Sequence, residues 1–503
     1  MEEKFIESEL VIGLVSAVGT ENQRVIDLLQ EQLGLAGYAV QVIKVSKDVI
    51  PLLCPVPDFG KDHYRRISGH MKAGNHAREV SDNPAILALG SAGAIYAART
   101  KNEKGDSEAT PKTAYIIDSL KRPEEVTELR VIYPTGFVLI GIHADKAKRE
   151  NRLTHDLGIR TELAADLMHR DGEETRVPYG QRVNRTFHLA DFFVRVSDSE
   201  GELKCDLKRI VSLWFGDPFV TPTFDEHAMF MAFGAALRSA DMSRQVGAVI
   251  TKDSQILSTG ANDCPKAGGG LYWPFRNPIT HCIGDEPKGR DYLRDGGDSN
   301  RRVQLRIIDQ IVKDGKDSDN GLDPEKLRAV LEGSPLRDLT EFGRVVHAEM
   351  EALLSCGRSG LSTVGTTLYC TTFPCHNCAK HIIAAGVERV VYVEPYPKSK
   401  ALEFHDDSIS PEAESDAEDS GKVRFNAFVG IGPRRFFDLF SMNLGSSYEL
   451  IRKHEDGTKL SWHIEKSQLR VQMKPTSYLE HERVASRNFR EVLAKTAKPP
   501  GDG

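Results

Sequence analysis

The chain has 503 residues, 40% of them hydrophobic and 28% charged, with a formal net charge of −7. This composition is ordinary for a globular protein of two or three domains, and its acidity argues against a broadly basic surface for nucleic acid. No stretch reaches the roughly 20 apolar residues that span a bilayer. The start MEEKFIESEL lacks a basic leader and the eight cysteines are scattered, so we expect a cytoplasmic protein with no membrane partner.

Residues 1–215 alternate between apolar runs and amphipathic helices. The strand ELVIGLVSAVG is followed by the helix NQRVIDLLQEQLGLAG and the strand YAVQVIKV, and two later buried strands are TAYIIDSL and GFVLIGIHA. This βαβ order predicts a first domain of the α/β class with a doubly wound parallel sheet.

The turn after the first strand lies where a P-loop would lie. A P-loop requires G-x-x-x-x-G-K-[ST], but here the two glycines are one residue too far apart and no lysine precedes the threonine. Backbone amides of such a turn can still bind phosphate, although phosphoryl transfer is not expected. The candidate nucleotide-binding residues are Gly13, Gly19, Thr20 and Asp118. Arg149, Arg152 and Arg160 are read either as lid arginines or as ordinary surface charges.

A second domain is predicted over residues 222–400. It contains the helix DEHAMFMAFGAALRSA, the paired strands SRQVGAVIT and QILSTGAND, a helix after HAE, the strand TTLYCTT, a helix at PCHNC and the strand RVVYVEP. This β-β-α-β-α-β order is interrupted by a long insertion over 264–343. Within the insertion, Cys264, His281 and Cys282 are candidate ligands of a second, structural zinc, and a lid is the alternative.

The remaining chain is expected to have three parts. Residues 401–422 are acidic and predict a flexible loop. Residues 423–486 regain aromatic character and are expected to pack on the second domain. Residues 487–503 are expected to form a flexible tail.

Two short motifs carry the chemistry of the second domain. His347-Ala348-Glu349 is followed by Pro374-Cys375-His376-Asn377-Cys378. One imidazole and two thiolates make a three-ligand zinc site with an open fourth position, which is the catalytic type. The two cysteines lie one turn apart at a helix N-terminus, where the dipole favours thiolates, and Glu349 lies just beyond the histidine.

This H-x-E and P-C-x-x-C pair is the pattern of zinc deaminases that act on nucleotide bases. Zinc makes hydroxide available at neutral pH, and Glu349 can move a proton from water to the ring. A structural zinc knuckle or a redox pair would not need a glutamate in that place.

The segments SRQVGAVIT, STGAND, VHAEMEALL and TTFPCHNCAKHIIAAGVERVVY resemble the deoxycytidylate deaminases over about residues 225–400. With the front domain and the segment GIGPRRFFDLF, the chain resembles the bacterial anti-phage dCTP deaminases, in which a P-loop kinase-like domain is fused to the deaminase. The resemblance implies a hydrolase that converts dCTP to dUTP and dCMP to dUMP and depletes the cytosine deoxynucleotide pool. It also implies a regulatory front domain, a small inhibitory RNA and a homo-oligomer.

The resemblance also assigns site residues. His347, Cys375 and Cys378 would bind one catalytic Zn²⁺, Glu349 would be the proton shuttle, Asn262 would bond the sugar hydroxyl, the Ala348 backbone would meet the base edge, and Phe373 would pack on the ring. Arg244 is a candidate phosphate ligand. Where these deaminases usually read GYNG, this chain reads GAND.

Two alternatives stay open. A polynucleotide deaminase acting on tRNA or single-stranded DNA shares the motifs, but such enzymes use a basic channel with stacking aromatics. A non-catalytic zinc- and nucleotide-binding regulator would have no use for Glu349. The preference between dCMP and dCTP is left undecided by the sequence.

Overall fold

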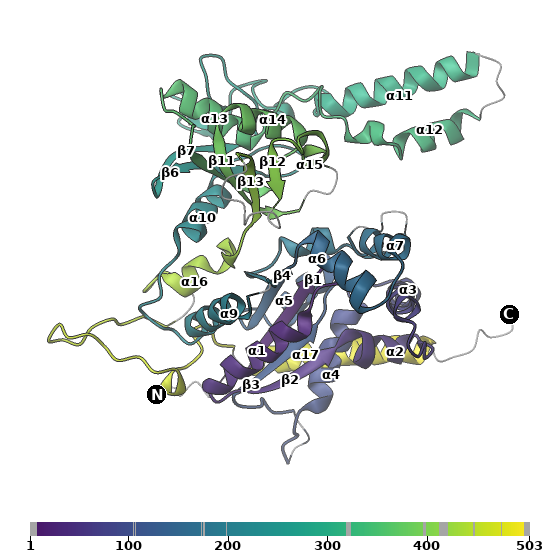
Figure 1. Ribbon diagram of the computed structural model, residues 1–503, viewed down its shortest axis with the longest axis vertical. Helices are drawn as coiled ribbons and strands as arrows, with labels where there is room; N and C mark the ends of the chain where they lie inside the picture. The colour runs from purple at the N-terminus through teal and green to yellow at the C-terminus, as the bar shows by residue number, and fades with distance from the viewer. Residues whose placement is uncertain are drawn as a thin grey trace. The chain divides into compact units, whose positions relative to one another are not determined.

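A computed structural model describes residues 8–103, 105, 107–172, 174, 177–197, 199–317, 323–395, 399–411, 421–445, 448–473 and 475–496. The chain divides into two compact units (Figure 1): unit 1 comprises Met1–His227 and Ala427–Gly503, and unit 2 comprises Ala228–Asn426. Unit 2 is therefore inserted in the sequence of unit 1. Within the described ranges, no helix combines the length and apolarity needed to cross a membrane.

Unit 1 is built on a six-stranded sheet with the order β14-β5-β4-β1-β3-β2. Five strands are parallel, as predicted, and β14 is antiparallel to β5. The strands are β1 (Leu10–Ser16), β2 (Ala39–Lys44), β3 (Thr113–Asp118), β4 (Phe137–His143), β5 (Phe192–Arg195) and β14 (Gly430–Ile431). Every residue of β1 is buried, because a central parallel strand is covered on both faces.

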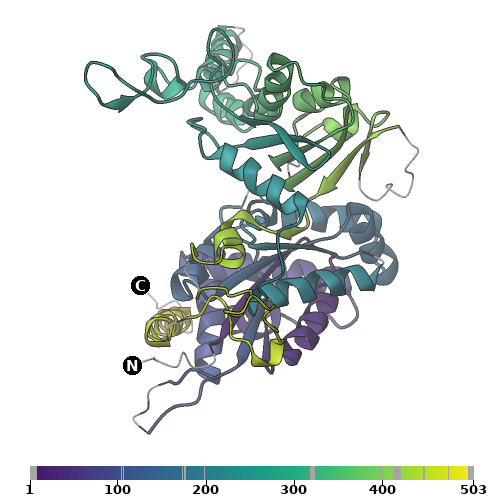
Figure 2. The same cartoon turned by 90° about the vertical axis from the view of Figure 1, so that its left-hand side faces the viewer.

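Helices lie on both faces of this sheet (Figures 1 and 2). Leu10, Ile12 and Leu14 of β1 share one core with the apolar sides of α1 and α9, so the alternate residues of β1 point to the opposite face. The helices are α1 (Asn22–Leu35), α2 (Ile50–Leu53), α3 (His63–Ser81), α4 (Ile86–Ala98), α5 (Pro123–Ile132), α6 (Lys146–Asn151), α7 (Thr161–Gly172), α8 (Val183–Phe187), α9 (Glu200–Trp214), α16 (Phe436–Phe440) and α17 (Pro475–Thr496).

The C-terminal segment differs from the prediction. Residues 427–503 belong to unit 1 rather than packing on the second domain, and residues 487–496 form the end of α17 instead of a flexible tail. The helix packs on α4, where Phe489 lies so close that a Cβ on Gly90 would be 2.7 Å from its ring. At the same contact Arg99 forms fully buried ion pairs with Glu482 and Glu9, each 2.6 Å long. Residues 497–503 lie outside the described part.

Unit 2 contains a second six-stranded sheet with the order β12-β13-β11-β10-β6-β7. Strand β10 is parallel to β11 and antiparallel to β6, and β6 is antiparallel to β7. The strands are β6 (Gly247–Lys252), β7 (Gln255–Ala261), β10 (Thr366–Thr372), β11 (Val387–Glu394), β12 (Ile409–Pro411) and β13 (Val423–Ala427). The helices are α10 (Phe224–Ala236), α13 (Ala348–Arg358), α14 (His376–Ala384) and α15 (Ala401–Phe404).

The predicted β-β-α-β-α-β order of unit 2 is confirmed. The acidic segment is only partly a loop, because α15 and β12 fall within 401–411; residues 412–420 lie outside the described part.

The insertion of unit 2 has a ribbon and a helical hairpin. The ribbon pairs β8 (Phe275–Arg276) with β9 (Ile283–Gly284), and the hairpin of α11 (Ser299–Asp317) and α12 (Pro324–Glu332) extends from the rest of the unit (Figure 1). The Val346 amide donates to the Asp263 carbonyl at 3.0 Å, so the two ends of the insertion are joined. Nearly buried Arg290 pairs with Asp263 at 3.2 Å and with Asp285 at 3.3 Å, which anchors the insertion at its base.

Candidate active site

The two motifs of unit 2 lie at the beginnings of two neighbouring helices. His347 immediately precedes α13, Cys375 immediately precedes α14, and Cys378 lies in the first turn of α14. Both helices pack on the same core of the sheet. Strand β7 can approach α13 closely because residue 260 is a glycine. A Cβ added to Gly260 would lie 2.1 Å from the carbonyl oxygen of Ala348.

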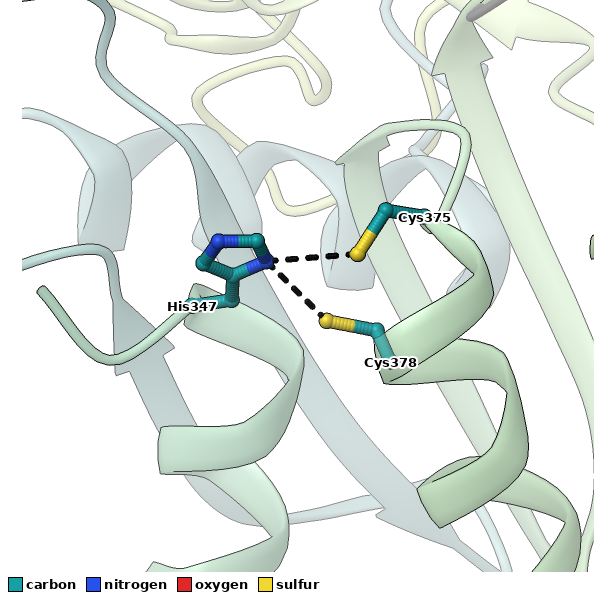
Figure 3. A group of neighbouring side chains, drawn as sticks. All are labelled: His347, Cys375 and Cys378. Carbon is teal, nitrogen blue, oxygen red and sulfur yellow. Dashed lines mark hydrogen bonds between the residues drawn. The ribbon is translucent and has the colours of Figure 1, made fainter. Parts of the chain in front are cut away.

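The three candidate ligands converge on one point (Figure 3). Nδ1 of His347 lies 3.4 Å from Sγ of Cys375 and 3.3 Å from Sγ of Cys378, and the three atoms lie within 4.8 Å of one another. Ligands at 2.0–2.3 Å from a tetrahedral zinc are about 3.5 Å apart, so this spacing fits the ion. In the described ranges it is the only group of three or more side chains that could hold a metal.

Hydrogen bonds within the cluster shift the pKa values of its ligands in opposite directions. A hydrogen bond with Cys378, helped by His347, lowers the pKa of Cys375 to about 4, which gives a thiolate at neutral pH. The bond to Cys375 in turn raises the pKa of His347 to about 9. A metal ion would displace the protons held on the imidazole and on Cys378, as is usual when zinc binds such ligands.

Glu349 lies beside this cluster as the second residue of α13. Its side chain is buried, and burial raises the pKa of its carboxyl above the usual range. A carboxyl whose pKa moves toward neutrality can both accept and return a proton, which suits a general acid and base.

Asn262 and Arg244 lie near each other at the end of the sheet. The Val246 amide donates to Oδ1 of Asn262 at 2.7 Å, and Nδ2 of Asn262 donates to the Arg244 carbonyl at 2.8 Å. The Asn262 amide thus holds the segment before β6, and its contact with a sugar stays a prediction. The Arg244 side chain is exposed and pairs with Glu394 at 3.2 Å.

Ala348 and Phe373 are both buried. Ala348 begins α13 and is fully covered. The ring of Phe373 packs against Tyr392 and Phe425, with centroids 4.8 and 5.4 Å away, so much of it belongs to the hydrophobic core. Phe373 is 9% exposed, and its packing on a base stays a prediction.

The structure does not support the second zinc site. Cys264 is buried, whereas His281 and Cys282 are exposed at the ribbon, and the three do not form a ligand group. The prediction of this second zinc site depended only on the proximity of these residues in the sequence of a loop. Ion pairs of Arg290 hold the base of the insertion instead.

In unit 1 the four candidate nucleotide-binding residues do not all lie in the turn. Gly13 lies inside β1, where a Cβ would be 2.8 Å from the Phe137 ring, so its role is packing. Gly19 has a φ of +90°, which favours glycine, and Thr20 follows it. Asp118 accepts a hydrogen bond from Asn22 at 2.7 Å.

A family match lies within the second domain. Residues 222–394 match the family described as "Cytidine and deoxycytidylate deaminase zinc-binding region". The deoxycytidylate deaminase of Enterobacteria phage T2 is 32% identical over 170 residues, covering 34% of this chain and 79% of the relative. That of Mycobacterium phage D29 is 30% identical over 171 residues, covering 34% of this chain and 94% of the relative. The solved dCMP deaminase of cyanophage S-TIM5 with dCMP and dUMP is 21% identical, covers 42% of this chain and 100% of that one, and has a TM-score of 0.23.

With a metal-ligand cluster beside a buried glutamate, the family match and the two phage relatives place the protein among the hydrolytic deaminases. The similarity extends over most of the length of both phage proteins. The chain belongs to the deoxycytidylate deaminase family.

Proposed function

We propose that unit 2 is a zinc-dependent hydrolase that converts dCTP to dUTP and dCMP to dUMP with release of ammonia. The observation that supports this most directly is the convergence of His347, Cys375 and Cys378 beside buried Glu349. A structural zinc site would need a fourth protein ligand, whereas this cluster offers three within the described residues.

In this proposal His347, Cys375 and Cys378 would hold the ion, which would supply a bound water with a pKa lowered to about 7. Glu349 accepts a proton from the attacking water, passes it to the ring nitrogen, and assists the departure of ammonia. Burial keeps the Glu349 carboxyl away from bulk water.

The remaining site residues are proposed to bind the nucleotide. Asn262 has a second amide hydrogen for the sugar hydroxyl, and the Ala348 backbone lies at the start of α13 for the base edge. Phe373 would pack on the base. Arg244 would exchange its surface pair with Glu394 for a phosphate group.

We further propose that the reaction depletes the cytosine deoxynucleotide pool of the cytoplasm in anti-phage defence. The resemblance to the anti-phage dCTP deaminases supports this role, together with a P-loop kinase-like unit 1 that regulates unit 2, an inhibitory RNA and a homo-oligomer. In unit 1 the parallel strand order, with the Gly19–Thr20 turn after β1, is in keeping with such a domain.

A mass-resolved assay with the full chain tests the reaction. Deoxycytidine, dCMP, dCTP, CTP and a cytosine-containing oligonucleotide are offered separately to the wild type and to Glu349→Gln, with bound zinc measured in both. We expect uracil product from dCTP or dCMP only in the wild type, with equal zinc in the two proteins. Product from the oligonucleotide alone would make this a polynucleotide deaminase, and equal turnover by Glu349→Gln would remove the glutamate from the mechanism.

A further inference from the structure

Three consecutive residues of the insertion in unit 2 contact the segments that carry candidate site residues. Arg344 lies three residues before His347, and its guanidinium is held by two groups of the insertion. Nη1 of Arg344 lies 2.6 Å from Oδ1 of Asp291, and Nη2 donates to the Gly289 carbonyl at 3.1 Å. The side chains of Arg344 and Asp291 are 30% and 12% exposed, so this pair is largely covered by protein.

Arg290, the residue between these two, contacts the other end of the insertion. Its guanidinium lies 3.2 Å from Oδ2 of Asp263 and donates to the Tyr272 carbonyl at 2.9 Å. Asp263 directly follows Asn262, and the side chains of Arg290 and Asp263 are both buried. The same short stretch of chain therefore holds the residue after Asn262 and the segment before the first metal ligand.

The two site segments are also joined to each other by their backbones. Val346 and Asp263 form an antiparallel bridge in which the Val346 amide donates to the Asp263 carbonyl at 3.0 Å. His347 is the next residue after Val346. Because an extended chain spans at most about 3.6 Å per residue, Arg344 lies within about 11 Å of His347 along the chain. A displacement of Arg344 therefore has little intervening chain in which to be absorbed.

The beginning of α11, also part of the insertion, holds the chain that leads to Arg344. Nδ2 of Asn300 and Nε2 of Gln304 both donate to the Leu339 carbonyl, each at 2.7 Å. These side chains lie in the first two turns of α11, one of them almost completely buried. The approach to the metal cluster is thus bonded to the insertion at successive points, although it contributes no candidate ligand itself.

We propose that residues 289–291 form a clasp with two arms, each of which positions one group of the active site. The first arm holds Arg344 and thereby His347. The second arm holds Asp263 and thereby Asn262. The proposal rests on the proposed function for the roles of His347 and Asn262, and it makes the residues of the clasp positioning residues. The first arm should affect the affinity for zinc, and the second the affinity for the nucleotide.

Zinc affinity of the full-length protein, measured by competition with a chelator, tests the first arm. Arg344→Met should raise the Kd for zinc at least about tenfold, a change that substitutions around metal ligands commonly produce. Arg344→Lys keeps a positive charge opposite Asp291 and should give a smaller rise. Arg328→Met removes an exposed ion pair with Asp309 inside the α11–α12 hairpin and is the matched control, with an unchanged Kd.

Steady-state deamination of dCMP by the zinc-loaded proteins tests the second arm. The double variant Arg290→Met, Asp263→Asn removes the ion pair without leaving a buried charge. Its KM for dCMP should rise at least about tenfold, as expected for the loss of a hydrogen bond to the sugar, while its Kd for zinc changes less. Arg344→Met should show the opposite split.

Hydrogen exchange of the Val346 amide, which bonds to Asp263, requires no turnover. Arg344→Met and the double variant should both speed this exchange, and Arg328→Met should not. Unchanged exchange and zinc Kd in folded Arg344→Met, or equal losses of zinc affinity and KM in both clasp variants, would overturn the proposal. A wild type that binds zinc but deaminates no cytosine nucleotide would contradict the proposed function alone, because exchange and zinc affinity still report on the clasp.

Discussion

Replacing Gly260 by alanine should displace α13, which carries His347 and Glu349 at its start. The added Cβ would lie 2.1 Å from the Ala348 carbonyl oxygen and 2.5 Å from the Ala352 amide nitrogen, and both atoms belong to the backbone of α13. Ordinary contact begins at 3.4 Å. The helix would have to recede by about 1.3 Å, a form of overpacking that costs about 1–3 kcal/mol of the free energy of unfolding.

The shift would separate the two halves of the site. His347 and Glu349 move with α13, whereas the two cysteines stay with α14. Since a misplacement of about 1 Å costs about 10²-fold in rate, we expect kcat for Gly260→Ala to fall by that factor, together with a loss of bound zinc. The measurements are steady-state deamination of dCMP and dCTP, metal content and thermal unfolding.

A matched control lies on the same helix. Gly357 of α13 has open space where a Cβ would be built, so Gly357→Ala should leave kcat unchanged and gain about 0.5–1 kcal/mol of stability. A folded Gly260→Ala protein with normal kcat and full zinc would refute the reasoning about the close approach of β7 and α13.

Further outcomes are expected elsewhere in the chain. A hydrogen bond with His143, helped by Arg195, lowers the pKa of Asp145 from 3.8 to about 2, which corresponds to about 2 kcal/mol of stability. Because the folded pKa is the lower one, this stability is present at neutral pH and is lost between about pH 5 and pH 2; Asp145→Asn should remove it in pH-dependent unfolding curves. Arg290→Met leaves Asp263 buried without its partner and should cost about 3–5 kcal/mol, of which Asp263→Asn in the same chain recovers part in chemical denaturation. Treatment with a zinc chelator should abolish deamination and lower the Tm, and restored zinc should reverse both changes.

The elements and the metal cluster could be predicted because they depend on local signals. Buried strands such as TAYIID and GFVLIGIH are continuous apolar runs. The two motifs place three ligands at the starts of helices, and this placement depends only on local sequence. The strands of unit 2 and their order followed from the same kind of reasoning.

The errors concern partners that are distant in the sequence. The packing of α17 on α4 depends on Glu482 reaching Arg99 across 383 residues, and no local pattern indicates such a pair. The sequence pattern places Gly13 in the turn, whereas in the structure its missing side chain makes room for the Phe137 ring.

The insertion of unit 2 between two segments of unit 1 affects how the protein folds during synthesis. Strands β1 to β5 leave the ribosome first, whereas β14 and α17 are synthesised only after all of unit 2. Unit 1 therefore cannot complete its fold until the end of the chain has been made. Until then Glu9 and Arg99 lack the carboxylate of Glu482, and the face of α4 that meets α17 is exposed to solvent. Unit 2 has its whole sequence available earlier. A chain truncated before residue 475 would therefore contain the whole deaminase region, but its unit 1 would lack α17 and could not complete its fold.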